Sequence, residues 1–178
     1  GIVPRGIVLP ETPGYSVEAE KYWAYYDPAE ARRLLDEAGW VPGSDGIRVK
    51  DGQRLRLVFL AIYTAQNEEL ALLLQSQLRA VGIDLELMLV DGSAFWGLST
   101  QDVFDIYRLD YGYTSTYDIL NNYFHSSRIP SPNRSGFASE RIDELLGMAL
   151  REMNEDLRYQ YLGEVQEIIA QNALWVSM

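Results

Sequence analysis

The stretch that decides the fold is DPAEARRLLDEAGW, residues 27–40, which predicts a short helix with both ends marked. Asp27 suits the N-cap position, where its side chain can accept hydrogen bonds from the first backbone N–H groups. Pro28 suits the first helical position, because the N–H group that proline lacks has no helical partner there. Gly39 can adopt the left-handed conformation that ends a helix. We therefore expect a helix over residues 28–39.

One side of this expected helix is apolar. The stripe follows the spacing i, i+3, i+4 and i+7 and consists of Ala31, Leu34, Leu35 and Ala38. Glu30 stands three residues after the cap, where a capping box places its acid, and Trp40 follows the terminal glycine as an apolar anchor. On physical grounds alone, the stretch is a well-capped surface helix.

The size of the chain suits one folded domain. It has 178 residues, of which 47% are hydrophobic, so it can form a core and is not of the disordered class. We expect a single domain over residues 1–178. Residues 1–21 show no periodicity and contain three prolines, so we expect them to form an extended connector.

Composition excludes several functions. The net charge of −11 comes from 26 acids and 15 scattered bases, without the basic stripe that a nucleic-acid binder needs. No apolar run approaches the roughly 20 residues of a membrane span, and no signal peptide is visible. Cysteine is absent and His125 is the single histidine, which argues against thiolate and multi-histidine metal sites. We expect neither a metal nor a cofactor.

The remaining pattern alternates strands and helices. The expected elements are a hairpin over 47–55 with its turn at Asp51-Gly52, a strand continuing to 62, a helix over 66–81, a strand over 83–89, a helix over 93–100, a strand over 103–109, and helices over 140–152 and 155–171. Residues 110–138 look irregular, and 173–178 look like the start of a strand. A strand–helix–strand order implies a parallel crossover. We expect an α/β fold in which helices flank a mixed sheet.

Few residues suggest catalysis. No Gly-rich phosphate loop occurs, and no G-x-S-x-G elbow offers a nucleophile to His125. A glycosidase needs two carboxylates facing each other across a cleft, and the available acids are Asp102, Asp105, Asp110 and Asp118. Their spacing does not show such an arrangement, so we expect no enzymatic activity and keep a hydrolase as the weakest alternative.

Aromatic and small polar residues gather in YRLDYGYTSTYDILNNYF, residues 107–124, directly after a predicted strand. Tyrosine rings with short polar neighbours at the exit of a strand suit a small-molecule cleft. The same residues also suit an aromatic minicore under a long loop. The residues alone leave both interpretations open.

The sequences of several segments resemble those of the family 5 extracellular solute-binding proteins, the oligopeptide- and dipeptide-binding components of ABC importers. Residues 27–40 are similar to the family signature DP-x-x-A-x-x-LL-x-EAGW. Further similar segments follow in the family's order, namely Gly82-Ile83-Asp84-Leu85-Glu86-Leu87, Phe104-Asp105-Ile106, Asn133 with Gly136-Phe137, Ile142-Asp143-Glu144-Leu145-Leu146, and Arg158 with Tyr161. Their order and spacing together make the resemblance specific.

The resemblance implies a periplasmic-binding-protein-like lobe, here the C-terminal lobe of a two-lobed receptor. It further implies capture of a small solute between lobes and delivery to a membrane permease. The full-length protein would then be periplasmic or extracellular and held at the cell surface by a lipid anchor. A non-transport structural or interaction module with the same fold is the alternative.

The resemblance also implies where the ligand lies. The family often carries a Trp and then an acid that pairs with a peptide's amino terminus; here Tyr111 or Tyr113 takes the Trp place, and Thr114 or Thr116 the acid place. An uncharged hydroxyl does not neutralise an ammonium group as a carboxylate does, which leaves room for an oligosaccharide as well as a peptide. The residues expected to contact ligand are Tyr111, Tyr113, Thr114, Thr116, Tyr117, Asp118 and, more weakly, Trp96.

Overall fold

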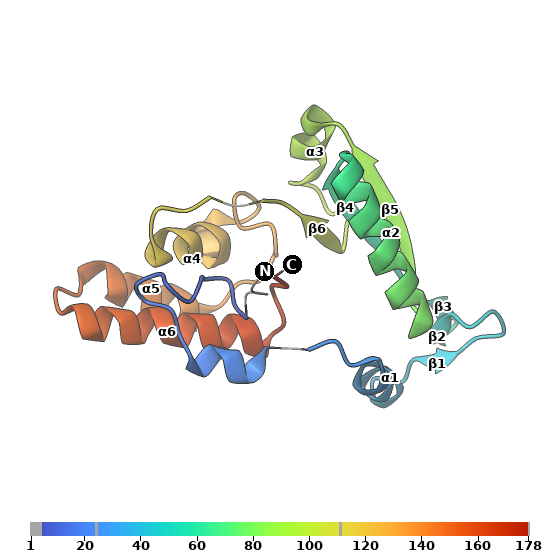
Figure 1. Ribbon diagram of the computed structural model, residues 1–178, viewed down its shortest axis with the longest axis horizontal. Coiled ribbons are helices and arrows are strands. Elements are labelled where there is room, and N and C mark those ends of the chain that lie inside the picture. The colour runs from blue at the N-terminus through green and yellow to red at the C-terminus, as the bar shows by residue number, and fades with distance from the viewer. Residues whose placement is uncertain (1–4, 24, 111, 178) are drawn as a thin grey trace. The chain divides into compact units, whose positions relative to one another are not determined.

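A computed structural model describes residues 5–23, 25–110 and 112–177, which form two compact units (Figure 1). Unit 1 comprises Gly1–Tyr25 and Tyr111–Met178, and unit 2 comprises Tyr26–Asp110. The chain therefore begins in unit 1, builds the whole of unit 2 and returns. The predicted α/β class is confirmed, whereas the expectation of one domain over residues 1–178 stays a prediction.

Unit 2 begins with the predicted capped helix, α1 (Pro28–Glu37). The Asp27 side chain accepts hydrogen bonds from the N–H groups of Ala29 and Glu30, at 3.0 and 2.9 Å. Gly39 has a φ of +85°, and the next N–H group, of Trp40, donates to the Leu35 carbonyl at 2.9 Å. This geometry is the C-terminal cap that glycine permits, so both predicted caps are confirmed, and the helix itself ends at Glu37, two residues before Gly39.

Two further features of α1 concern Glu30 and the apolar stripe. The Glu30 carboxylate pairs with Arg33, with distances of 2.6 and 2.7 Å to its guanidinium nitrogens. The apolar stripe is not buried within unit 2, since none of the helix residues is buried and Leu34 is 52% exposed. Amphipathic spacing marks an apolar face without fixing what covers it.

A small antiparallel sheet follows α1. Its strands are β1 (Val41–Pro42), β2 (Arg48–Lys50) and β3 (Gln53–Arg54), in the order β1-β2-β3. Asp51 and Gly52 have φ angles of 51° and 79°, which is the geometry of a primed two-residue turn. The predicted hairpin is therefore confirmed.

A parallel sheet forms the centre of unit 2. Its strands are β4 (Arg56–Ile62), β5 (Asp84–Val90) and β6 (Ile106–Arg108), in the order β5-β4-β6. Helix α2 (Ala65–Ala80) joins β4 to β5 and packs against the sheet, and α3 (Gly92–Leu98) comes after β5 and before β6 in the chain, at one end of the sheet (Figure 1). The buried core consists of Phe59, Ala61, Ala71 and Leu85. The predicted parallel crossover is confirmed.

Unit 1 is helical. It contains η1 (Glu18–Tyr22), α4 (Thr116–Phe124), η2 (Ser126–Arg128), α5 (Glu140–Arg151) and α6 (Glu155–Gln171). Ser139 and Asn154 cap α5 and α6 through their side-chain oxygens, as predicted. The two helices pack together and η1 packs on α6 (Figure 1). The largest buried side chains of this core are Ile119, Leu120, Phe124, Ile142, Leu145, Leu146 and Leu162.

Three segments of unit 1 differ from the sequence-based expectation. Part of the region expected to be irregular forms α4, because Ser115 caps it and its apolar side chains enter the core. The expected connector ends in η1 and buries Val8 completely. Residues 173–177 form no strand, since Ala173 adopts a φ of 49° just after α6. Among the described residues, no helix is long and apolar enough to cross a membrane.

Candidate functional site

The start of α4 in unit 1 holds a compact group of polar side chains. Asp118 Oδ2 accepts hydrogen bonds from the hydroxyls of Thr114 and Ser115, the latter at 2.8 Å. Ser115 Oγ in turn accepts from the Asp118 N–H at 3.1 Å, as an N-cap does. These donors, Thr114 first, lower the pKa of Asp118 from its ordinary value. The group therefore presents an ionised carboxylate beside an exposed hydroxyl.

Two predicted tyrosines flank this group and pack against the core of unit 1. The Tyr113 hydroxyl accepts a hydrogen bond from the Leu9 N–H at 3.3 Å. The Tyr117 hydroxyl donates to Asn121 Oδ1 at 3.5 Å, and burial raises the pKa of Tyr117. Both rings are half-buried, so they serve the core and also present an edge to solvent. The minicore and the cleft are thus compatible interpretations of one segment.

The structure separates the two threonines that the sequence left as alternatives. Thr116 is only 2% exposed, and its hydroxyl donates to the Pro13 carbonyl at 2.6 Å. Thr114 is exposed. Of the two threonines, only Thr114 is therefore open to a solute on the surface of unit 1. Tyr111, also predicted to contact ligand, lies outside the described residues.

Trp96 belongs to unit 2, on α3. Its ring is 50% exposed and packs edge-on against the buried ring of Phe95, with centroids 5.2 Å apart. Asp91 caps α3 directly after β5, which places the helix at the carboxyl end of the parallel sheet. The structure thus puts Trp96 in a different unit from the other predicted contacts.

The carboxyl end of the parallel sheet carries two further side chains that sequence reasoning did not select. Tyr63 follows β4, is 57% exposed, and binds Glu68 Oε2 through its hydroxyl at 3.3 Å. Arg108 ends β6 and binds Asp110 with both terminal nitrogens. In open parallel sheets, ligands bind beyond the carboxyl ends of strands, where the chain changes direction around a central strand. Their position at the ends of predicted strands was the signal that could have found them.

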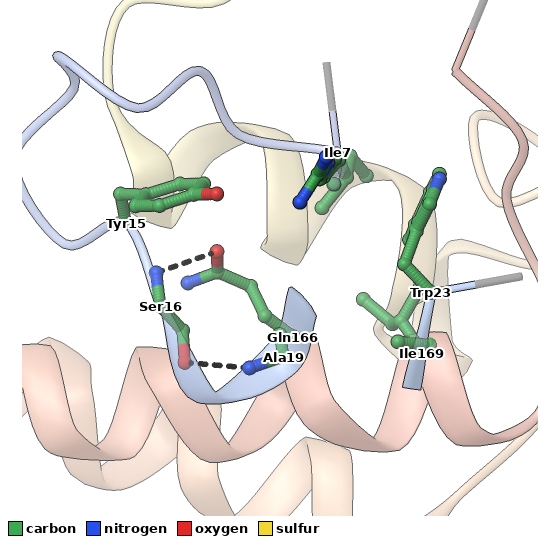
Figure 2. Close-up of a pocket in the computed structure, with 10 residues that line it drawn as sticks. Ile7, Tyr15, Ser16, Ala19, Trp23, Gln166 and Ile169 are labelled. Carbon is green, nitrogen blue, oxygen red and sulfur yellow. Dashed lines mark hydrogen bonds between the residues drawn. The ribbon is translucent and has the colours of Figure 1, made fainter. Parts of the chain in front are cut away.

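Unit 1 also contains a hollow beneath its N-terminal segment (Figure 2). Its volume is about 230 Å³ when the adjoining open solvent is counted. It holds no space as large as a water molecule. The Gln166 side chain at its base accepts from the Ser16 N–H at 3.2 Å and donates to the Gly14 carbonyl at 2.7 Å. Figure 2 shows Tyr15 over that amide and Trp23 at the other end of the hollow, beside Ile169. The hollow is therefore a packing junction and offers no room for a solute.

His125 and Asp105, two residues considered for catalysis, make structural contacts. His125 Nδ1 lies 3.0 Å from Ser127 Oγ and 3.4 Å from Asp143 Oδ1. A Ser-His-Asp triad needs the hydroxyl and the carboxylate on different ring nitrogens. Asp105 Oδ2 accepts from the Val58 N–H at 2.7 Å and so joins β6 to β4. Within the ranges that the structure describes, no group of three or more potential ligands could hold a metal ion.

Comparison with known proteins gives a consistent result. The family model described as "Bacterial extracellular solute-binding proteins, family 5 Middle" matches residues 2–131. Protein XP55 of Streptomyces lividans is 30% identical over 149 residues, which cover 80% of this chain and 27% of that protein. Oligopeptide-binding protein AppA of Bacillus subtilis is 28% identical over 90% of this chain and 30% of its own length. The chain spans about 30% of the length of the curated relatives it matches.

Solved structures share the fold. The structure of AppA from Bacillus subtilis in complex with a nonapeptide matches 99% of this chain and 36% of its own, with a TM-score of 0.86 and 22% identity. NikA from Brucella suis, in complex with Fe(III)-EDTA, matches 98% of this chain and 36% of its own, with a TM-score of 0.81 and 25% identity. An oligopeptide-binding protein of Thermotoga maritima with bound mannohexaose matches with a TM-score of 0.85 and 19% identity.

Proposed function

Because this chain belongs to the family 5 bacterial extracellular solute-binding proteins, we propose that it forms part of a receptor for an ABC importer. The receptor captures a peptide or a similar small solute, such as an oligosaccharide, and presents it to a membrane permease. It acts in the periplasm or outside the cell, anchored through lipid in the full-length protein. The family match over residues 2–131 is the observation that carries this proposal.

The solute class depends on local side chains, since the fold accommodates different ligands. The related structures hold a nonapeptide, an iron chelate and mannohexaose. In this chain, the exposed Thr114 hydroxyl bonds to Asp118. The hydroxyl bonds that the Asp118 carboxylate accepts from Thr114 and Ser115 both fall on Oδ2. Among the described residues this leaves Oδ1 for an ammonium or hydroxyl group of the solute. Tyr113 and Tyr117, in the same unit, supply aromatic surface for it.

Retention of a solute tests this function. We would purify the protein from its own host without denaturation and identify the bound molecules by native mass spectrometry. We expect a peptide or oligosaccharide in wild type and a lower occupancy in Asp118→Asn and Thr114→Val. The matched control is Thr100→Val, because Thr100 is exposed on unit 2 and bonds only weakly to Gly97, at 3.4 Å.

The outcome separates the alternatives. An empty protein that also fails to bind alanine pentapeptide and mannohexaose in calorimetry would contradict solute capture and favour a structural or interaction module. Equal occupancy in the Asp118→Asn and Thr100→Val variants would leave capture standing and move its site away from α4.

A further inference from the structure

Strand β5 is an open edge of the parallel sheet. It pairs with β4 on one side, and no described strand of unit 2 follows it on the other side (Figure 1). The Asp84 N–H group and the Val90 carbonyl bond to residues at the two ends of β4. Because successive residues of a strand direct their backbone groups to alternate sides, the N–H and C=O groups of Leu85, Leu87 and Leu89 point away from β4.

This edge can accept another strand. Folded proteins block such edges with short strands, proline, lysine or a bulge, whereas β5 has seven residues, contains neither proline nor lysine, and pairs with β4 over its whole length. Its acids, Asp84 and Glu86, are paired with arginines of β3 and β4. The Leu85 carbonyl accepts a hydrogen bond from Gln75 Nε2 at 2.7 Å, and a carbonyl oxygen can accept a second one.

One side of α2 lies along the same edge. The bond from Gln75 to the outward-pointing Leu85 carbonyl identifies that side. Residues three or four positions apart share one side of a helix, which adds Glu68, Leu72 and Arg79. These three side chains are exposed, and Leu72, in the middle of the helix, is 53% exposed. We call positions 68, 72, 75 and 79 the α2 seam.

The α2 seam is complementary to a second copy of itself. When two copies of α2 run antiparallel about a two-fold axis, position 68 of each lies opposite position 79 of the other, and position 72 lies opposite position 75, since both pairs share one midpoint. Glu68 then meets Arg79 of the second copy twice per dimer, and the two Leu72 side chains lie between these ion pairs. The charges therefore favour a second copy in this orientation.

The strand edge has the same symmetry. Two copies of β5 paired antiparallel about Leu87 place Leu85 opposite Leu89 and Leu87 opposite itself, so the outward-pointing residues form hydrogen-bonded pairs. On the other face, the two acids of β5 fall opposite Val90 and Met88. No like charges face each other in this register, which would otherwise oppose pairing.

The strand contact and the helix contact fit one dimer. Helix α2 packs against both β4 and β5, and neighbouring strands lie about 4.8 Å apart. A helix above that pair of strands is about 5 Å from a two-fold axis beyond β5, so two copies of α2 would be about 10 Å apart. Packed helices are about 8–10 Å apart, so both contacts can form together.

We infer that two copies of this chain associate through unit 2, with their β5 strands joining the two sheets and their α2 seams packed beside them. One short strand and one helix seam form a small interface, so the dimer belongs to the weak, transient class. The inference concerns unit 2 by itself and does not depend on solute capture.

Sedimentation equilibrium of the whole chain, from about 10 μM to about 1 mM, tests the dimer. A salt concentration of about 0.15 M limits the repulsion between two copies of net charge −11. We expect wild type to dimerise towards the upper concentrations. Glu68→Arg and Arg79→Glu should each weaken association about tenfold, because each places like charges opposite one another twice. The double variant should restore it.

Glu69→Arg is the matched control. Glu69 is exposed on the same turn of α2 but lies outside the seam, and the substitution changes the net charge equally. Association should be unaffected in this variant. A protein that stays monomeric throughout, an equal weakening by Glu68→Arg and Glu69→Arg, or a double variant without rescue would overturn the inference.

Amide hydrogen exchange tests the strand contact in wild type, so it does not depend on any variant folding. The N–H groups of Leu87 and Leu89 should exchange more slowly as the fraction of paired chains rises with concentration. Those of Glu86 and Met88, which point towards β4, should exchange at the same rate at every concentration. An exchange rate of Leu87 that ignores concentration in a dimerising protein would overturn the pairing of β5.

Discussion

The buried guanidinium of Arg48 donates a hydrogen bond of 2.8 Å from Nε to the carbonyl oxygen of Val81, which lies 33 residues later in the chain. Nη1 of the same group donates to the Trp40 carbonyl at 2.6 Å and pairs with Asp36. The side chain is 4% exposed. One arginine thus satisfies the carbonyl groups that follow α1 and α2 and ties both helices to β2.

Arg48→Met should destabilise unit 2 strongly. Methionine keeps an unbranched side chain at this position but leaves the carbonyl groups of Val81 and Trp40 without their donor. We expect a loss of about 3 kcal/mol in the free energy of unfolding, measured by urea denaturation. Arg56→Met is the control, since Arg56 is 60% exposed. A similar loss in both variants would mean that the buried contacts of Arg48 contribute little.

Gly82→Ala should be more harmful than Gly52→Ala. Both glycines have positive φ angles, +94° and +79°. A Cβ atom on Gly82 would lie 2.7 Å from Arg48 Cγ, whereas one on Gly52 would meet nothing within 4 Å. We expect about 1 kcal/mol for the backbone conformation alone at position 52 and about 3 kcal/mol at position 82, in thermal or urea unfolding. Equal losses in the two variants would show that the Arg48 side chain moves aside for the new Cβ atom without a cost in free energy.

Ala173→Gly should stabilise unit 1. Ala173 has a φ of 49° just after α6, and the next N–H group, of Leu174, donates to the Ile169 carbonyl at 3.1 Å. The same position after α1 is Gly39. Glycine removes the cost of a left-handed side-chain residue, so we expect a gain of about 1 kcal/mol in unfolding free energy. The reverse change, Gly39→Ala, should cost a similar amount, and an unchanged or lower stability for Ala173→Gly would contradict this explanation.

Thr114→Val should raise the pKa of Asp118 towards its ordinary value of about 3.9, because the first of its hydroxyl donors is lost. The pKa of Asp118 is lower in the folded protein than in the unfolded chain. Asp118 therefore stabilises the fold at pH values above its ordinary pKa, and this stabilisation is lost as the pH falls through the pKa of the folded state. Carboxyl carbon chemical shifts followed from pH 7 to pH 2 would measure the change. A titration curve identical to wild type would show that Thr114 does not hold the carboxylate in solution.

Thr116→Val should destabilise unit 1, whereas Thr114→Val should not. Thr116 is buried and its hydroxyl bonds to the Pro13 carbonyl, so the change removes a hydrogen bond that joins the N-terminal segment to α4. We expect a loss of about 1–2 kcal/mol in unfolding free energy at position 116 and a much smaller one at the exposed position 114. A larger loss for Thr114→Val than for Thr116→Val would contradict the structural role assigned to Thr116.

Predictions made from the sequence succeeded where the interactions are local. The caps at Asp27, Ser139 and Asn154 bind N–H groups two or three residues away, so each helix start could be predicted from its own residues. Helix α4 has the same signal, Ser115 three residues before Asp118, but the surrounding tyrosines hid it within a region that looked irregular. The Arg108–Asp110 fork was missed because two charges at i and i+2 have no special meaning until a strand directs them.

The sequence by itself determined most of the secondary structure and the family, through caps, periodicity and the DPAEARRLLDEAGW stretch. The tertiary structure alone decided which of these side chains are exposed and which are buried. Leu34 belongs to an apolar stripe and stays exposed, while Thr116 looks like a surface residue and is buried. The physical reason is that burial depends on partners far along the chain, such as Pro13, 103 residues before the threonine whose hydroxyl it binds.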